Sequence, residues 1–452
     1  MSAVISTERA AGLRRFKPYS VYKDSGVEWL GEVPAHWEEK RLRFVCRVNP
    51  SKAEISALPR TTEVSFLPME AIGEDGKLNH EETRTLDQVW QGYTYFRDDD
   101  VLVAKITPCF ENGKGALCKG LTSGVGFGTT ELEVIRPGDA LWPPFVLYLT
   151  RSHPFRNLGI ASMKGVAGQQ RVTEDFIKDF KACFPTINEQ RAIAAFLDRE
   201  TAKIDMLVAK KERLIELLQE KRSALITQAV TKGLDPASPM KTSGIKWIGK
   251  IPAHWLLLQL NRVINKFVDY RGATPEKALG GIPLVTARNI KNGAIDMGLS
   301  SEFIREEDYD EWMVRGLPDV GDVVLTTEAP LGESAQITDT RIALAQRIIL
   351  FKANRVRITN DYLKYHFASH SGIGELWSRA TGSTAIGIKA SHLKQIFVTV
   401  PPLNEQEAIT GHIDGETAKL DALIAKVQEG IEKLKDYRTA LISAAVTGKI
   451  DV

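Results

Sequence analysis

The sequence predicts an α+β protein in which two similar domains alternate with two long helices. Two observations support this prediction: one long stretch occurs twice, and the sequence before each copy is rich in short β-strand patterns. The first copy runs from Asn-Glu-Gln at 188–190 to Ala-Val-Thr at 229–231, and the second from 404–406 to 445–447. The copies are 216 positions apart (404 − 188) without a gap. A repeat this long indicates two copies of one unit rather than a solenoid, whose repeats are about 20–50 residues long.

The composition is that of an ordinary globular protein, with 43% hydrophobic and 26% charged residues. Its 452 residues are enough for about three domains. A formal net charge of +2 does not demand a nucleic-acid partner, although Lys and Arg could still cluster on one face. The four cysteines lack Cys-x-x-Cys spacing, which favours reduced thiols over a zinc site. Because no run of about 18 apolar residues occurs and no signal peptide is recognisable, we expect a cytoplasmic protein without a membrane anchor.

A shorter block lies near the start of each predicted domain. The block at 25–37 ends in Pro-Ala-His-Trp and returns at 243–255 with the same ending. Its Gly and Pro residues predict turns, and its tryptophans predict anchors that hold a short segment on a domain surface. Because His36 and His254 both lie in this block, we expect them to pack or cap rather than to catalyse a reaction.

These signals divide the chain into five parts. Residues 1–23 are polar and basic without periodicity, which predicts a loosely held arm. The other parts are a first domain at 24–185, a long helix at 186–235, a second domain at 236–402 and a second long helix at 403–452. Each domain is expected to contain a mostly antiparallel sheet, because β-rich runs such as 101–104 and 132–135 are separated by Gly, Asp, Asn and Pro.

Both long helices carry a heptad pattern. Asn188 is a suitable N-cap for the first helix, and Gly233 follows its end. Position a is apolar except at Lys211, whereas position d is interrupted by Lys221 and Gly430. This pattern favours a two-helix coiled coil over a fully buried helix. About 35 helical residues at ~1.5 Å per residue predict a helix of about 50 Å.

The motifs that most resemble catalytic sites are each incomplete. Residues 244–251 approach a phosphate-binding P-loop, but the Ser or Thr that would hold magnesium is missing. Residues 142–145 (Trp-Pro-Pro-Phe) approach the aromatic-proline loop of amino-methyltransferases, but Trp142 cannot hold the target amine as Asn or Asp does, so a helix start is expected instead. His366 and His370 have metal-ligand spacing, yet Leu149 stands at the first of these positions in the other copy. We therefore expect neither a catalytic nor a metal site.

Basic and amide side chains in or beside predicted loops are candidates for a DNA surface, because Arg, Asn and Gln make bidentate contacts with base edges. The candidates in the first domain are Lys105, Lys114, Gln169, Gln170 and Arg171. The candidates in the second domain are Arg271, Arg288, Asn289 and Lys291. The alternative for each residue is an ordinary solvated loop. The two domains differ most in loops such as 165–171 and 382–387, as expected of modules that recognise different targets.

The arrangement resembles the specificity subunit of Type I restriction–modification systems. The resemblance rests on the Gly-Val-Glu-Trp-Leu-Gly…Pro-Ala-His-Trp segment at 26–37, its copy at 244–255 and the Pro-Pro-Leu-Asn-Glu-Gln helix start at 401–406. Residues 185–190 match that helix start less closely. The resemblance implies two α/β target-recognition domains alternating with two long helices that form an antiparallel coiled coil, in a pseudo-twofold molecule.

The same resemblance implies a non-catalytic DNA-binding subunit, in which each domain reads one half of a bipartite asymmetric site and the helices set the spacer. It implies as partners double-stranded DNA, two modification subunits that methylate adenine with S-adenosylmethionine, and two restriction subunits that use ATP and magnesium. No cofactor is expected in this chain. Two alternatives stay open: a coiled-coil adaptor with two protein-binding domains, and an enzyme with an unrecognised cleft. The adaptor would lack the steeply salt-dependent DNA affinity that a specificity subunit has.

Overall fold

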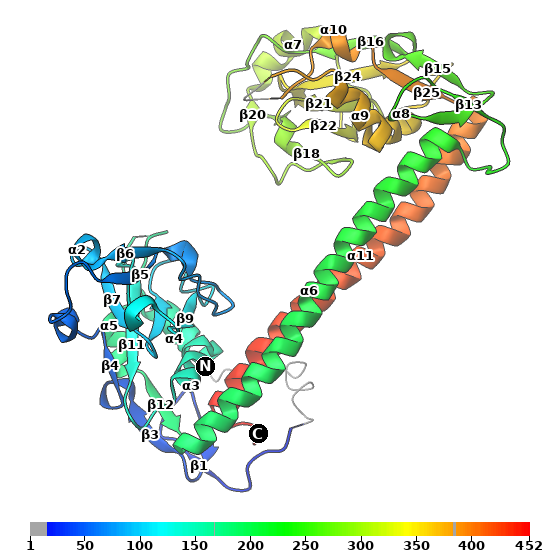
Figure 1. Cartoon of the computed structure of the whole chain (residues 1–452). Helices are drawn as coiled ribbons and strands as arrows, with labels where there is room; N and C mark the ends of the chain where they lie inside the picture. The colour runs from blue at the N-terminus through cyan, green and yellow to red at the C-terminus, as the bar shows by residue number, and fades with distance from the viewer. Residues whose placement is uncertain (1–15, 167, 383–385) are drawn as a thin grey trace. The chain divides into compact units, whose positions relative to one another are not determined.

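The computed structural model describes residues 16–166, 168–382 and 386–452 (Figure 1). The chain divides into two compact units. Unit 1 is Met1–Lys211 with Gln428–Val452, and unit 2 is Glu212–Val427. Each unit therefore contains one domain together with parts of both long helices. The mixture of helices and strands confirms the α+β prediction, whereas the five-part division of the chain stays a prediction.

Unit 1 contains two four-stranded sheets and two pairs of strands. The first sheet has the order β4 (Cys46–Val48), β11 (Leu132–Pro137), β8 (Val101–Ala104) and β9 (Gly115–Leu117), all antiparallel. The second has the order β6 (Thr83–Thr85), β5 (Glu63–Leu67), β10 (Val125–Gly128) and β7 (Thr94–Arg97), with β5 and β10 parallel. The pairs are β1 (Tyr22–Asp24) with β2 (Glu32–Pro34), and β3 (Glu38–Arg41) with β12 (Lys181–Phe184). The apolar run 101–104 is buried on both faces of its sheet, which explains why it lacks polar alternation.

Unit 2 repeats the strand order of the first sheet. Its four-stranded antiparallel sheet is β16 (Ile264–Asp269), β24 (Ile348–Ala353), β21 (Val323–Thr327) and β22 (Leu331–Gln336). Its second sheet is β20 (Phe303–Ile304), β17 (Ile282–Val285) and β23 (Ala343–Leu344), with β17 and β23 parallel. The pairs are β13 (Met240–Thr242) with β14 (Lys250–Pro252), β15 (Leu256–Gln259) with β25 (Phe397–Val400), and β18 (Ile290–Lys291) with β19 (Ala294–Ile295). The first sheets therefore share one strand order, whereas the second sheet has four strands in the described part of unit 1 and three in that of unit 2.

Short helices connect the strands in both units. In unit 1 they are α2 (Leu86–Val89), α3 (Pro143–Arg151), α4 (His153–Ser162) and α5 (Glu174–Asp179), with 3₁₀ helices η1 (Leu42–Phe44), η2 (Lys52–Ile55), η3 (Met69–Ala71) and η4 (Thr122–Gly124). In unit 2 they are α7 (Tyr309–Trp312), α8 (Asn360–Ala368), α9 (His370–Ser378) and α10 (Ala390–Leu393), with η5 (Leu260–Arg262), η6 (Ala287–Asn289), η7 (Glu306–Asp308) and η8 (Met313–Arg315). Helix α3 begins at Pro143, which confirms that the Trp-Pro-Pro-Phe segment is a helix start.

The long helices are longer than the heptads predict. Helix α6 (Ile187–Lys232) has 46 residues and α11 (Leu403–Val446) has 44, against the expected 35 or so (Figure 1). The difference arises because the first turns of each helix pack against a domain and follow its surface rather than a heptad. The N-cap prediction at Asn188 is also wrong. Asn188 lies inside the helix, and the hydroxyl of Thr186 accepts a hydrogen bond from the Glu189 amide (3.4 Å).

The two long helices run antiparallel within each unit. In unit 1, Asp205 near the start of α6 binds Arg438 near the end of α11 (2.9 Å). In unit 2, Asp421 of α11 binds Arg222 of α6 (3.2 Å). Asp205 and Asp421 are equivalent residues of the repeat, as are Arg222 and Arg438. The same ion pair is therefore formed twice, once in each unit.

Two of the heptad interruptions face each other. A Cβ atom added to Gly430 of α11 would lie 2.9 Å from Nζ of Lys211 of α6, both in unit 1. The missing side chain at Gly430 thus makes room for the long side chain of Lys211 on the neighbouring helix. The two interruptions of the heptad pattern are therefore complementary, because the lysine occupies space that the glycine leaves open.

The N-terminal arm is not loosely held where the structure describes it. The ring of Phe16 packs edge-on against Phe196 of α6, with centroids 5.3 Å apart. The Tyr19 hydroxyl donates to Glu189 (2.7 Å), and the carbonyl of Lys17 accepts from the amide of Asp451 (2.8 Å). The polar composition of the arm conceals these two aromatic anchors. Residues 1–15 of the predicted arm lie outside the described residues.

Candidate nucleic-acid interface

The repeated His-Trp residues bind the start of a long helix in each unit. In unit 1 the indole of Trp37 donates to Glu189 (3.0 Å), and Nε2 of His36 lies 2.8 Å from the same carboxylate. In unit 2 Trp255 (2.9 Å) and His254 (2.7 Å) bind Glu405 in the same way. Both tryptophans are fully buried. The contact of each histidine with the start of a long helix agrees with the predicted packing or capping role.

The glutamine of each Asn-Glu-Gln motif joins the helix start to its domain. The side-chain amide of Gln190 donates to the carbonyls of Pro185 (2.9 Å) and Ala140 (3.0 Å), and its oxygen accepts from the Trp142 amide (2.8 Å). Gln406 of unit 2 makes the equivalent set of bonds, with Pro401, Arg357 and Thr359. Buried polar groups that are fully bonded in this way fix one geometry. The most strongly repeated residues are therefore used to hold the helices.

Each domain also holds the end of the other long helix. In unit 1 the amide of His153 at the start of α4 donates to the hydroxyl of Ser443 on α11 (3.0 Å). In unit 2 the amide of His370 at the start of α9 donates to the hydroxyl of Thr227 on α6 (2.9 Å). The repetition of the two histidines thus reflects a backbone contact.

The opposite end of the main sheet in unit 1 brings the predicted DNA-binding residues together. Backbone hydrogen bonds join Ala104 to Lys114 (3.0 Å), Thr107 to Gln170 (3.0 Å) and Val172 to Lys105 (2.9 Å). Lys105, Lys114, Gln170 and Arg171 therefore lie on adjacent segments where β8 ends, and the carbonyl of Gln169 accepts from the Arg171 guanidinium (3.3 Å). Five residues chosen for their type and loop setting share one surface region.

Two basic residues of this region form ion pairs with carboxylates. Arg171 donates from Nε and Nη2 to the two oxygens of Glu131, both at 2.8 Å, and this hydrogen bonding lowers the pKa of Glu131. Lys105 binds Glu133 (3.1 Å), whose side chain is only 5% exposed. The Arg171 side chain is 44% exposed, so it is oriented by Glu131 and still accessible to a ligand.

Unit 2 has the same backbone arrangement at this end of its sheet. Thr327 takes the place of Lys105: its amide donates to the Arg347 carbonyl (2.9 Å) and its carbonyl accepts from Ile388 (3.0 Å). In unit 1 the corresponding bonds link Lys105 to Glu131 and to Val172. Isolated bridges also correspond, since Arg171 pairs with 106 and 164, and Gly387 pairs with 328 and 381.

One position of this shared backbone carries opposite charges in the two units. Unit 1 has Glu131 bound to Arg171, with Ile106 beside them. In unit 2, Arg347 stands at the position of Glu131, and it lies 3.6 Å from Glu328, which stands at the position of Ile106. Both arrangements place one arginine and one glutamate at the end of the sheet. We call this region of each unit the divergent end.

The candidates of the second domain divide into two groups. Arg271 lies at the divergent end, where it binds Asp269 (2.7 Å) and the carbonyl of Ile388 (2.7 Å). Arg288 and Lys291 are exposed beside β22, since the next residue, Asn292, donates from its amide to Glu333 (3.2 Å).

Asn289 differs from its neighbours because it is fully buried. Its oxygen accepts from Thr286 (2.8 Å), and its amide donates to the carbonyls of Asp296 (3.0 Å) and Ser300 (2.8 Å). An amide that is committed to its own loop cannot also contact a base. The sequence pattern could not separate this loop-capping asparagine from an exposed one.

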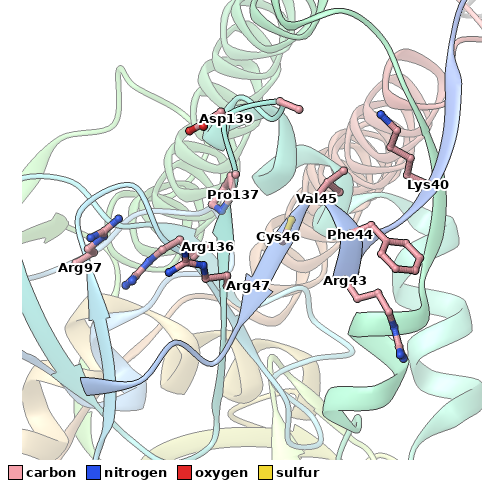
Figure 2. Close-up of a pocket in the computed structure, with 12 residues that line it drawn as sticks. Lys40, Arg43, Phe44, Val45, Cys46, Arg47, Arg97, Arg136, Pro137 and Asp139 are labelled. Carbon is pink, nitrogen blue, oxygen red and sulfur yellow. The ribbon is translucent and has the colours of Figure 1, made fainter. Parts of the chain in front are cut away.

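A basic cleft that the sequence did not reveal lies at the other end of β11 (Figure 2). Its volume is about 830 Å³. Its basic lining residues are Lys40, Arg43, Arg47, Arg97 and Arg136. Arg136 is held by Asp100 and Glu54, each at 2.6 Å, and Arg43 by Asp179 at 2.6 Å. These residues were missed because they lie on strands and a 3₁₀ helix rather than in loops.

The described part of the chain comprises residues 16–166, 168–382 and 386–452. No group of three or more His, Cys, Asp and Glu side chains there could hold a metal ion. His366 is fully buried, and burial lowers its pKa to about 4. No helix in this part of the chain is both long and apolar enough to span a bilayer.

Comparisons with known sequences give a consistent result. No protein-family model matches the chain. The Type I restriction enzyme EcoEI specificity subunit of Escherichia coli is 37% identical over 179 residues, which are 39% of this chain and 30% of that protein. The chain thus spans less than a third of that relative. The putative Type I restriction enzyme MjaX specificity subunit of Methanocaldococcus jannaschii is 22% identical over 434 residues, which are 94% of this chain and 96% of that protein.

Solved structures share the fold. A structure described as showing complex assembly and conformational transition of the Type I restriction–modification system matches with a TM-score of 0.69 at 18% identity, over 92% of this chain and 98% of that one. The crystal structure of the HsdS subunit from Thermoanaerobacter tengcongensis matches with a TM-score of 0.51 at 17% identity, over 94% and 100% of the two chains. The chain is therefore similar in sequence to Type I restriction enzyme specificity subunits and has the fold of a solved HsdS subunit.

Proposed function

We propose that the chain is the DNA-binding specificity subunit of a Type I restriction–modification complex. Each unit reads one half of a bipartite, asymmetric site. The observation that carries this proposal is the contrast between the two ends of each domain. The His-Trp and Glu-Gln residues that hold the starts of the long helices are the same in both units, whereas residues on the shared backbone of the divergent end differ in charge. Two modules built for the same position but different targets would differ in this way.

The long helices have the second role in this proposal. They pair as an antiparallel coiled coil, relate the two recognition domains by a pseudo-twofold axis, and set the spacer between the half-sites. The repeated Asp–Arg ion pair supports this pairing, because it forms between equivalent residues in each unit. DNA half-sites recognised by paired modules are commonly about 34 Å apart, or a multiple of that distance, along the helix axis.

The chemistry belongs to partner subunits in this proposal. Two modification subunits dock on the helices and methylate adenine with S-adenosylmethionine, and two restriction subunits use ATP and magnesium. The specificity subunit supplies sequence recognition in the cytoplasm and binds no cofactor of its own. Adenine methyltransferases turn the target base out of the duplex, so the recognition domains also have to hold distorted DNA.

The test is a map of N6-methyladenine. The full chain is co-expressed with its cognate modification subunit in a host that lacks adenine methylation, and the same host without the chain is the control. The proposal predicts methylation at one bipartite motif, which disappears in the control. Assembly of a complex that binds S-adenosylmethionine but methylates no defined sequence would contradict the proposal and favour the adaptor.

A further inference from the structure

The reversed charge at one backbone position distinguishes the divergent end from the rest of each domain. The backbone bonds of Lys105 and Thr327 are the same, so the two units have not diverged here through a change of fold. The side chains of Glu131 and Arg347 nevertheless occupy one backbone position with opposite charge. A change of charge on a constant backbone alters what the surface can bind while the domain stays the same.

From this arrangement, and resting on the proposed function, we propose that Arg171 in unit 1 and Arg347 in unit 2 determine specificity. Each arginine reads a guanine in the half-site of its own unit. Glu131 and Glu328 are positioning residues that orient the guanidinium groups. Arginine pairs with O6 and N7 of guanine through two parallel hydrogen bonds, which is a common specific contact in the major groove.

The geometry of Arg171 suits this contact. Its guanidinium has five N–H groups. Two donate to Glu131 and one to the carbonyl of Gln169 (3.3 Å). In the described part of the chain this leaves two N–H groups, one on each terminal nitrogen, for a bidentate contact. The ion pair with Glu131 also restricts the side-chain rotamers before DNA binds, which reduces the entropy lost on binding.

Arg347 is also accessible for a bidentate contact, but its guanidinium group is less firmly oriented. It lies 3.6 Å from Glu328, and its side chain is 49% exposed against 44% for Arg171. Its backbone is nevertheless fixed, because its carbonyl accepts from the amide of Thr327 (2.9 Å). Pairs this exposed contribute little to stability, so a structural role alone gives no reason for both units to keep one.

The experiment uses the full chain in its complex with the modification subunit. Methylation rates are measured on duplexes in which each position of both half-sites is substituted in turn. Arg171→Ala is expected to reduce discrimination at one base pair of one half-site by about 10- to 100-fold, which corresponds to the loss of one bidentate pair. Arg347→Ala is expected to do the same in the other half-site.

Two further variants sharpen the result. Arg171→Lys keeps the charge but not the planar fork, so it is expected to lose the same discrimination while DNA affinity at low salt is retained. Glu131→Gln is expected to weaken discrimination at the same base pair without lowering the unfolding temperature. Arg84→Ala is the matched control, because Arg84 of β6 is 34% exposed and bound to Glu82 (2.9 Å), and it neither belongs to the divergent end nor lines the basic cleft. It should leave the motif unchanged.

Three outcomes would overturn the inference. They are an unchanged motif in Arg171→Ala, an equal loss at all positions of both half-sites, or the same loss in Arg84→Ala. If Arg171→Ala does not fold, Arg171→Lys decides the matter by the same criterion. Failure of the proposed function is distinguishable, because the unsubstituted complex would then methylate no bipartite motif at all.

Discussion

At the scale of single residues, the two units show how one position can be used differently. Tyr148 and Tyr365 are equivalent and both donate a hydrogen bond to an aspartate on a long helix. The next residue of this repeat is Leu149 in unit 1 and His366 in unit 2, and both are buried. A leucine fills its site at no electrostatic cost, whereas a buried histidine has to stay neutral.

This difference predicts a pH dependence that is confined to unit 2. Burial lowers the pKa of His366 from 6.5 to about 4, so the unfolded chain takes up the proton at higher pH than the folded chain. The contribution of neutral His366 to the stability of unit 2 is therefore fully present above about pH 6.5 and is lost as the pH falls towards 4. The expected loss attributable to this group is about 3 kcal/mol.

The substitution His366→Leu tests this prediction, because leucine is the residue that unit 1 uses at this position. Denaturant unfolding is measured between pH 4 and 7 for both proteins. The wild type is expected to lose stability relative to the variant below pH 6.5. A constant difference between the two proteins across this range would contradict the prediction.

Residue types alone identified only part of the candidate interface. The four basic or amide residues Lys105, Lys114, Gln170 and Arg171 meet in space because backbone bonds bring their segments together, which no local pattern encodes. The side chain of Asn289 is of a type that pairs with bases, but it is fully buried. The partners of Arg171 and Arg347 could not be predicted from the sequence either. Arg171 and Glu131 are 40 residues apart, so their ion pair depends on the tertiary fold, as does that of Arg347 with Glu328.

At the scale of elements, the internal repeat predicted both long helices, because it covers nearly their whole length. The ends were less predictable, since Thr186 rather than Asn188 caps α6. The interruptions at Lys211 and Gly430 could be explained only once the neighbouring helix was in place. Side-chain contacts between helices decide such positions, and a single heptad register does not contain them.

Three glycines within α11 give a prediction about helix stability. A Cβ atom added at Gly411 or Gly415 would meet no other atom within 4 Å, so alanine fits there without strain. Each of these substitutions is expected to stabilise the protein by roughly 0.5–1 kcal/mol, because glycine loses more backbone entropy in a helix.

Gly430→Ala is the matched control for that prediction. Its Cβ would lie 2.9 Å from Nζ of Lys211, so the lysine has to move and part of the gain is lost. Thermal unfolding of the three single variants compares them directly. A larger gain at Gly430 than at Gly411 would show that the contact with Lys211 does not limit this site.

At the scale of the whole molecule, similar contacts join the end of a long helix to the Trp-containing segment of the domain in each unit. The connectivity of the chain at these contacts differs between the units. In unit 2, Gly233 follows α6 and lies against Trp255, and Lys232 donates to the carbonyl of Lys250 (2.6 Å). In unit 1, Gly448 lies against Trp37 in the same way, and Lys449 donates to the carbonyl of Leu30 (2.9 Å). In unit 2 the end of α6 continues directly into the domain that it contacts. In unit 1 the corresponding contacts join the C-terminal segment after α11 to the N-terminal part of the chain, without a covalent link.

This equivalence defines junctions for exchanging one domain with the other. The amide of Leu42 donates to the carbonyl of Phe180 (3.0 Å), and the amide of Leu260 donates to the carbonyl of Ile396 (2.9 Å). Residues 42–180 can therefore be replaced by residues 260–396 at matching positions. The replacement leaves β3 and β12 paired and keeps both long helices unchanged.

The methylation motif of this exchanged chain, in complex with the modification subunit, tests the central claim most directly. If each domain reads its own half-site and the helices only set their spacing, the motif will contain the second domain's half-site twice, in opposite orientations with the original spacer. Retention of the first half-site, or a change in both halves to unrelated sequences, would contradict the claim that the two domains recognise DNA independently.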